Sequence, residues 1–98
     1  MTWATPISAG AWNSVVAYHD SVNNFLGISV NGGTFTKLSH SGGVFTGGSS
    51  VIGIGGNPAV SSAYWSGRID NPWFWNRVLT QAEATEFHNG GAGKEWPA

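Results

Sequence analysis

The chain has 98 residues, which is enough for one domain with a thin hydrophobic core. Only 9% of its residues are charged and its net charge is −1, so it lacks the stripe of basic side chains that a nucleic-acid binder needs. It has no cysteine for disulfide bonds, no apolar run long enough to span a membrane, and no signal-peptide pattern in its first ten residues.

Short segments rich in β-branched and aromatic residues alternate with glycine pairs, a pattern typical of an antiparallel sandwich or barrel. The first predicted strand covers residues 12–19 and ends at the polar turn 20–24. The second covers residues 25–30, where Leu26, Ile28 and Val30 alternate with smaller or polar residues. Because side chains alternate between the faces of a strand, these three are expected to face the core.

Asn31-Gly32 then predicts a hairpin turn, because both central residues of a type I′ turn need a positive φ. A return strand is expected over residues 34–38. Two further strands are expected over residues 51–54 and 64–75, the second interrupted or ended near Pro72.

Residues 79–88 break the β pattern and predict one short helix. Thr80 is placed as its N-cap and Glu83 three residues later, the spacing of a capping box in which each side chain pairs with a free backbone N–H. Asn89-Gly90-Gly91 should end the helix, because glycine accepts the left-handed conformation found there. A helix of about two turns must dock on the sheet to be stable.

Five segments together resemble the laminin-G-like family of concanavalin A-like jelly rolls, in its bacterial and phage members. Residues 28–32 are similar to the family's L-Y-V-N-G hairpin, and residues 75–83 to its strand-to-helix segment. The other similar segments are residues 12–20, 52–55 and 65–70, and residues 89–97 resemble the tail of many members. The order and spacing of all these segments match the C-terminal half of the family's domain.

This resemblance implies an all-β fold: an antiparallel β-sandwich of the jelly-roll type, shortened, with one short helix near the C-terminus. Residues 1–98 would form a single module that lacks the N-terminal strands of the family's longer domain. Either the chain is a fragment of the longer domain, or another copy supplies the missing half. A homo-oligomer is expected, because pairing of two copies would cover the open strands. Trp3 and Trp96 are the candidate interface residues, whereas Trp12, Trp65 and Trp75 match family positions that fill the core.

Nothing in the sequence supports catalysis. Glycan hydrolases of this fold use two carboxylates on one strand, but no two acids of this chain stand two apart on a strand. The three histidines, His19, His40 and His88, have no metal-binding spacing, and no serine lies in a nucleophile-elbow motif. The chain is therefore predicted not to be an enzyme.

Ligand-binding candidates lie at the rim of the predicted sandwich: Asp20, Asn23, Asn24 and Tyr64. Asp20 and Asn23 also offer oxygen atoms suited to calcium, which many relatives bind at a sandwich edge. The alternative is that this Asx-rich turn forms for backbone reasons alone. No other cofactor is expected.

Two functions remain open. The first is a lectin-type module that recognises glycans, supported by the resemblance and by six tryptophans. The second is a structural, self-assembling component of a virion or appendage, whose copies complete one another's sandwich. Either function predicts an extracellular or virion-associated protein.

Overall fold

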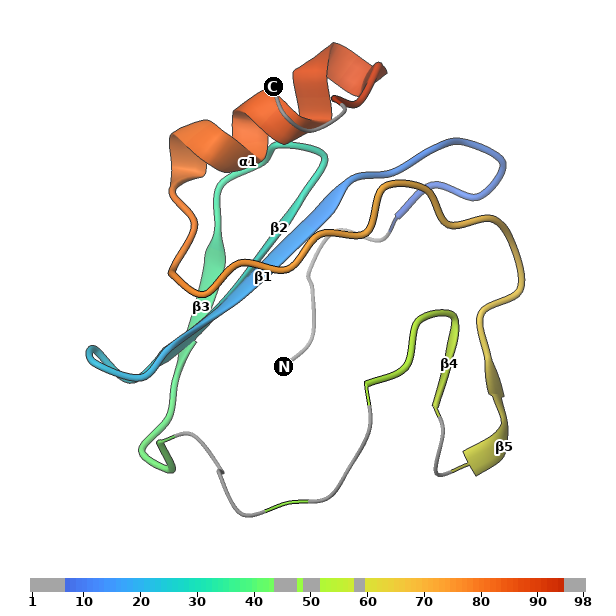
Figure 1. Ribbon diagram of the computed structural model, residues 1–98. Coiled ribbons are helices and arrows are strands. Elements are labelled where there is room, and N and C mark those ends of the chain that lie inside the picture. Colours follow the sequence, from blue (N-terminus) through green and yellow to red (C-terminus); the bar gives the residue numbers. More distant parts are fainter. Residues whose placement is uncertain (1–6, 44–47, 49–51, 58–59, 95–98) are drawn as a thin grey trace. The chain divides into compact units, whose positions relative to one another are not determined.

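The computed structural model describes residues 7–43, 48, 52–57 and 60–94 (Figure 1). The chain divides into two compact units, and each is described by itself. The first comprises residues 1–44 and 75–98, and the second comprises Phe45–Phe74. No helix among the described residues is long and apolar enough to cross a membrane.

The first unit contains a three-stranded antiparallel sheet in the order β1-β2-β3. The strands are β1 (Val15–Asp20), β2 (Phe25–Val30) and β3 (Thr36–Ser39). The predicted bounds of β2 are confirmed, whereas β1 begins three residues later than expected. Side-chain hydrogen bonds explain the late start, because Asn13 Nδ2 donates to the carbonyls of Ser8 and Ala11 in place of a strand ladder.

The predicted turn between β2 and β3 is confirmed. Asn31 and Gly32 have φ values of 53° and 72°, and the N–H of Gly33 donates to the carbonyl of Val30 at 3.0 Å. Asn31 also joins the turn to the start of β1, because its Oδ1 accepts the N–H of Ser14 at 2.9 Å. The turn is therefore tied to the sheet by a side chain as well as by the ladder.

Burial on the sheet differs from the simple alternation expected. Val30 is buried as predicted, but Leu26 and Ile28 are only half-buried. Gly27 and Ser29, on the opposite face, are the more buried residues. The ring of Tyr18 covers Gly27, where an added Cβ would come within 2.3 Å of it. A small residue thus lies inside because an aromatic ring from the neighbouring strand closes over it.

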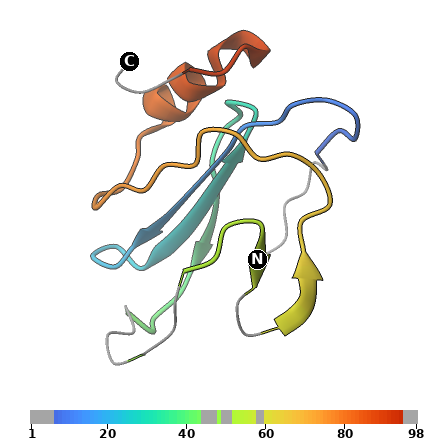
Figure 2. The same cartoon turned by 45° about the vertical axis from the view of Figure 1, so that its right-hand side comes forward.

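The helix α1 (Gln81–His88) packs at the end of the sheet where β2 turns into β3 (Figures 1 and 2). Gln81 Oε1 accepts the N–H of Phe35 at 2.9 Å, and Gln81 Nε2 donates to the carbonyl of Gly33 at 2.8 Å. Leu79 and Ala84 are buried. One side chain at the first turn of the helix therefore satisfies both a donor and an acceptor of the hairpin.

Both ends of α1 are as predicted. Thr80 and Glu83 form the capping box, and Asn89 adopts the left-handed conformation with φ 49° and ψ 48° at the C-cap. The short 3₁₀ turn η1 (Asn89–Gly91) follows, with Gly90 at φ 64°.

The second unit contains a two-stranded antiparallel sheet, β4 (Gly56–Asn57) with β5 (Val60–Tyr64). The strands predicted over residues 51–54 and 64–75 are wrong: residues 52–54 are not in a strand, residue 51 lies outside the described residues, and no strand covers 65–75. Within residues 65–75 the backbone does not stay extended, because Gly67 has φ 153° and Asn71, just before Pro72, has φ 51°.

The tryptophans also depart from the expected core positions. Trp12 and Trp65 are 60% and 54% exposed. Trp75 is half-buried and stacks on Phe87 of α1, with ring centroids 6.0 Å apart. The predicted interface residues Trp3 and Trp96 lie outside the described residues.

Candidate functional site

Three of the four predicted ligand-binding residues lie in the turn between β1 and β2. The Asp20 carboxylate closes this turn: Oδ1 accepts the N–H groups of Val22 and Asn23 at 3.1 and 3.0 Å, and Oδ2 accepts Asn23 Nδ2 at 2.9 Å. These bonds from Asn23 and Val22 favour the charged carboxylate and hold the pKa of Asp20 below its usual value. Asn24 is exposed and has φ 61°.

The donor set of this turn does not fit calcium. A calcium ion takes six to eight oxygen ligands, and the turn offers one carboxylate, both of whose oxygens already accept hydrogen bonds. The Asn23 side chain directs its amide N–H toward Asp20. No group of three or more His, Cys, Asp or Glu that could hold a metal ion occurs among the described residues. The bonds are those of an Asx turn, which stabilises its own backbone.

Tyr64, the fourth predicted residue, belongs to the second unit and lines a shallow hollow of about 530 Å³ there. The hollow is wide open to solvent, unlike the clefts that enclose most of a small ligand. Its walls come from β4, β5 and the segments that flank them. The lining residues are Gly53, Gly55, Gly56, Asn57, Ser62, Ala63, Tyr64, Trp65 and Ile69.

Glycines bring the two aromatic rings of the hollow close to the backbone. Tyr64 pairs with Gly56 in the β4–β5 register, and a Cβ on Gly56 would lie only 2.9 Å from the Tyr64 ring. The Trp65 ring lies close to Gly67, where an added Cβ would come within 3.2 Å of Nε1. Trp65 Nε1 also donates to the carbonyl of Arg68 at 3.3 Å. The backs of both rings are therefore supported while their exposed fractions stay at 70% and 54%.

Trp65 and Gly56 were not among the predicted site residues. A glycine opposite an aromatic residue in a hairpin leaves room for the ring to lie flat, and this signal applies to Gly56 and Tyr64. That signal requires the strand register, which places Tyr64 opposite Gly56, and the sequence alone did not specify it.

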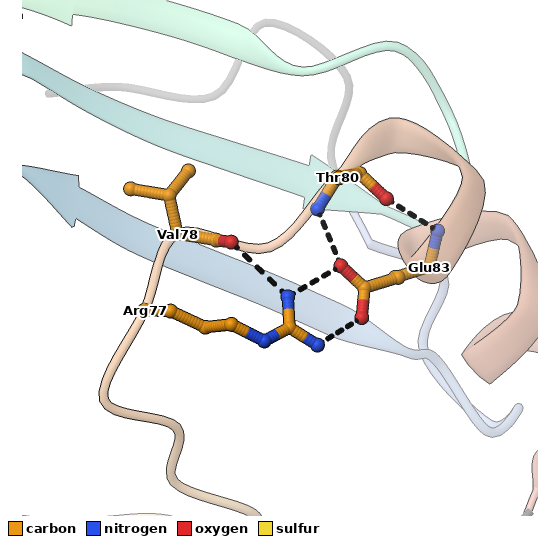
Figure 3. Close-up of polar contacts among 4 residues, drawn as sticks. All are labelled: Arg77, Val78, Thr80 and Glu83. Atoms are coloured by element: carbon orange, nitrogen blue, oxygen red, sulfur yellow. Dashed lines mark hydrogen bonds and ion pairs between the residues drawn. The ribbon is translucent and has the colours of Figure 1, made fainter.

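The acidic residues that the structure describes in the first unit take part in structural contacts. Glu83 accepts both arms of the Arg77 guanidinium at 2.8 and 2.5 Å and also caps α1 through the N–H of Thr80 at 2.9 Å (Figure 3). The hydrogen bonds from Arg77 lower the pKa of Glu83 to about 2, and the hydrogen bond to Glu83 raises the pKa of Arg77. Glu86 pairs with Lys94 at 2.7 Å. Both carboxylates, of Glu83 and Glu86, therefore form contacts that stabilise the helix.

A family model described as the concanavalin A-like lectin/glucanases superfamily, of the laminin-G type, matches residues 2–85. Searches of the curated proteins and of the solved structures returned no match. The superfamily covers sugar-binding lectins and sugar-cleaving glucanases alike, so it fits a binding module in general terms.

Proposed function

Because the chain belongs to the concanavalin A-like lectin/glucanases superfamily, we propose that it is a non-catalytic module that recognises carbohydrate. The observation that carries this proposal is the hollow of the second unit, where Tyr64 and Trp65 are exposed on a glycine-rich backbone. The C–H face of a sugar ring packs well on an aromatic face, and such a contact needs exposed rings whose position is already set.

The polar side chains that line the hollow also suit a carbohydrate ligand. Asn57 and Ser62 line it beside the two rings, and hydroxyl and amide groups are the usual partners of sugar hydroxyls. The hollow is shallow, which favours one or two sugar residues of a longer chain over a fully enclosed small molecule. A glycan-binding role would be consistent with the extracellular or virion-associated location expected from the sequence, and that location remains part of the proposal.

The contacts of three acidic residues, Asp20, Glu83 and Glu86, support a role without catalysis. Hydrolysis of a glycosidic bond uses two carboxyl groups about 5 to 9.5 Å apart, one on each side of the bond. Asp20, Glu83 and Glu86 each hold a turn or an ion pair. None of these three acids lines the hollow.

The test is binding of the untagged chain to a glycan array, followed by calorimetry with the best ligand. We expect Tyr64→Ala and Trp65→Ala each to weaken binding at least about tenfold, because each removes an aromatic face. Tyr64→Phe keeps the ring and should retain most of the affinity. Trp12→Ala is the matched control, since Trp12 is also exposed but belongs to the other unit.

Two results would contradict the proposal. One is the absence of any glycan ligand on a broad array. The other is a ligand whose affinity is unchanged in both Tyr64→Ala and Trp65→Ala, which would place the sugar elsewhere on the chain.

A second candidate function is self-assembly, which the sheet of the first unit favours. One face of this sheet carries the apolar residues Val15, Leu26, Ile28 and Leu38, of which Val15 and Leu38 are 54% and 45% exposed, and the same face carries His19 and Thr36. Strands β1 and β3 are the edges of this sheet, and a second copy presents an identical face and identical edges. We propose that two copies associate through this face.

Light scattering coupled to size exclusion tests this association. A discrete dimer or larger assembly that becomes monomeric in Leu38→Lys supports it, because a charge on the face opposes burial. A wild-type monomer at high micromolar concentration would contradict it. Thr34→Lys, which adds the same charge to the exposed β2–β3 connection, is the control.

A further inference from the structure

Two of the three histidines meet at one end of the β1–β2–β3 sheet. His19 lies on β1, opposite Leu26 in the register, and His40 directly follows β3. The N–H of His40 donates to the carbonyl of Asn24 at 2.9 Å, which extends the pairing of β2 and β3 by one step. The two imidazole rings stand 4.5 Å apart between centroids, tilted by 50°. Residues 21 apart in the sequence thus form an imidazole pair.

Nitrogen atoms of this pair are not used by the fold. His40 Nε2 is buried and makes no hydrogen bond, a costly state for a polar atom. The His19 ring makes no hydrogen bond to another described residue, and its side chain is exposed. His88, by contrast, bonds through Nδ1 to Ser14 Oγ at 3.2 Å. An unpaired buried nitrogen next to an accessible imidazole calls for a ligand that both rings can share.

We propose that His19 and His40 together bind a divalent late transition-metal cation such as Zn²⁺, Cu²⁺ or Ni²⁺. Neutral imidazole is a common ligand of these ions, and the two rings, which come together from β1 and from the end of β3 on either side of β2, can approach one ion from two sides. His40 Nε2 gains the partner it lacks, and His19 supplies the solvent-facing ligand. Water completes the coordination, which leaves the ion open to an additional ligand from outside.

The Lys37 side chain does not lie on the face of the sheet that carries the histidine pair, so its charge does not oppose binding of a cation there. Lys37 is the only strong base of β3, and its Nζ lies 5.8 Å from the centroid of the Phe25 ring, on the opposite face of the sheet. The pair is also separate from the Asp20 turn, whose carboxylate accepts hydrogen bonds from its own turn. Imidazole discriminates against hard ions, so Ca²⁺ and Mg²⁺ should not bind at the pair.

The first experiment is calorimetric titration of the untagged full chain with ZnCl₂. We expect one binding event that weakens at least about tenfold in His19→Phe and in His40→Phe, since phenylalanine keeps an aromatic ring at the position but removes the nitrogen ligands. His88→Gln, which removes the third histidine, should bind Zn²⁺ as the wild type does. CaCl₂ should give no binding heat in any of these proteins.

A second measurement on the wild-type chain protects the test against variants that fail to fold. Nitrogen-15 spectra of the imidazole rings should show a zinc-dependent shift at His19 and His40 and none at His88. The proposal is overturned if Zn²⁺ shifts neither ring of the pair, or if only His88 responds. It is equally overturned if well-folded His19→Phe and His40→Phe retain wild-type affinity.

Discussion

At the scale of single residues, close approach between a glycine and an aromatic ring recurs in both units. Tyr18 covers Gly27 in the first sheet, and Tyr64 lies over Gly56 in the second. Tyr18 is further held by Phe35, edge to face at a centroid distance of 5.0 Å. In both places the missing side chain of glycine lets an aromatic ring lie directly on the backbone, which buries the ring's underside.

We expect Gly27→Ala to lower the free energy of unfolding by about 1 kcal/mol, because the new Cβ would lie 2.3 Å from Tyr18 and displace its ring. Urea unfolding followed by tryptophan fluorescence measures the change. Gly42→Ala is the matched control, since no atom lies within 4 Å of the Cβ it adds, and it should stay within about 0.5 kcal/mol of the wild type. Equal effects from both substitutions would show that Tyr18 does not constrain Gly27.

The lowered pKa of Glu83 predicts that the folded protein loses stability in acid. Its pKa falls from 4.5 to about 2 in the folded chain, because the carboxylate accepts hydrogen bonds from Arg77 and from the N–H of Thr80. A lowered pKa stabilises the fold above the unfolded value, and this contribution is lost as the pH drops from about 4.5 toward 2.

Urea midpoints of the wild type and of Glu83→Gln, measured from pH 7 down to pH 2, test this linkage. The difference between the two proteins should be greatest above pH 4.5 and shrink below it. A difference that stays constant down to the lowest pH would mean that the charge of Glu83 contributes nothing to stability.

At the scale of elements, α1 and the turns are held by a few side chains that each make several bonds. Gln81 bonds to both Phe35 and Gly33 of the β2–β3 connection. Thr80 and Glu83 cap the helix reciprocally, and Arg77 contacts the Trp75 ring at 5.4 Å while it pairs with Glu83. The strand-to-helix segment is therefore set by polar side chains more than by a large core.

Gln81→Ala should lower the free energy of unfolding by about 1 kcal/mol, because it removes two hydrogen bonds that join the helix to the hairpin. The loss outweighs the slightly better helix propensity of alanine. Glu86→Ala, on the same helix, removes only the surface ion pair with Lys94 and should cost about 0.5 kcal/mol or less. Similar losses in the two variants would show that Gln81 does not dock the helix.

The hydrogen bonds of the β1–β2 turn predict that calcium does not change the stability of the protein. Because the Asp20 carboxylate already accepts three hydrogen bonds, CaCl₂ should not raise the melting temperature above that in NaCl of equal ionic strength. Asp20→Asn should lower the melting temperature equally in both salts. A calcium-specific rise that disappears in Asp20→Asn would instead establish a calcium site at this turn.

At the scale of the whole molecule, the low content of charged residues limits the interactions that the protein can make with itself and with partners. The 98 residues include only four strong bases and five acids. Two ion pairs of the described residues, Arg77–Glu83 and Lys94–Glu86, lie at the surface. Association and ligand binding must therefore depend on apolar contacts and hydrogen bonds. The two units carry different candidate functions: a sugar-binding hollow in one, and an apolar sheet face with a histidine pair in the other.

This composition predicts weak dependence of stability on salt. Raising NaCl from about 0.01 M to 0.15 M shortens the Debye length from about 30 to 8 Å, but few exposed charges are present to be screened. The urea midpoint should change less than it does in Gly27→Ala. A larger shift would reveal long-range electrostatic interactions that the two surface pairs do not account for.

The sequence by itself determined the features that depend on neighbouring residues. Asn31-Gly32 specified the hairpin turn, Thr80 and Glu83 specified the start of the helix, and Asn89 with Gly90 specified its end. The order of the motifs also identified the superfamily, which the match over residues 2–85 confirms. Local φ preferences and capping bonds act within a few residues, so they can be read without knowledge of the fold.

Only the tertiary structure decided which distant residues meet. The register put Gly27 beneath Tyr18, and the pairing of β2 with β3 brought His40 to His19, although their sequence spacing predicted no shared site. The strand expected over residues 64–75 does not form, because Gly67 and Asn71 turn the backbone. Residues 52–54 are not in a strand either. Apolar pattern alone could not distinguish a strand from an irregular segment there, because both can be rich in large apolar residues. Strand register arises from long-range pairing, and the hollow around Tyr64 and the histidine pair both depend on it.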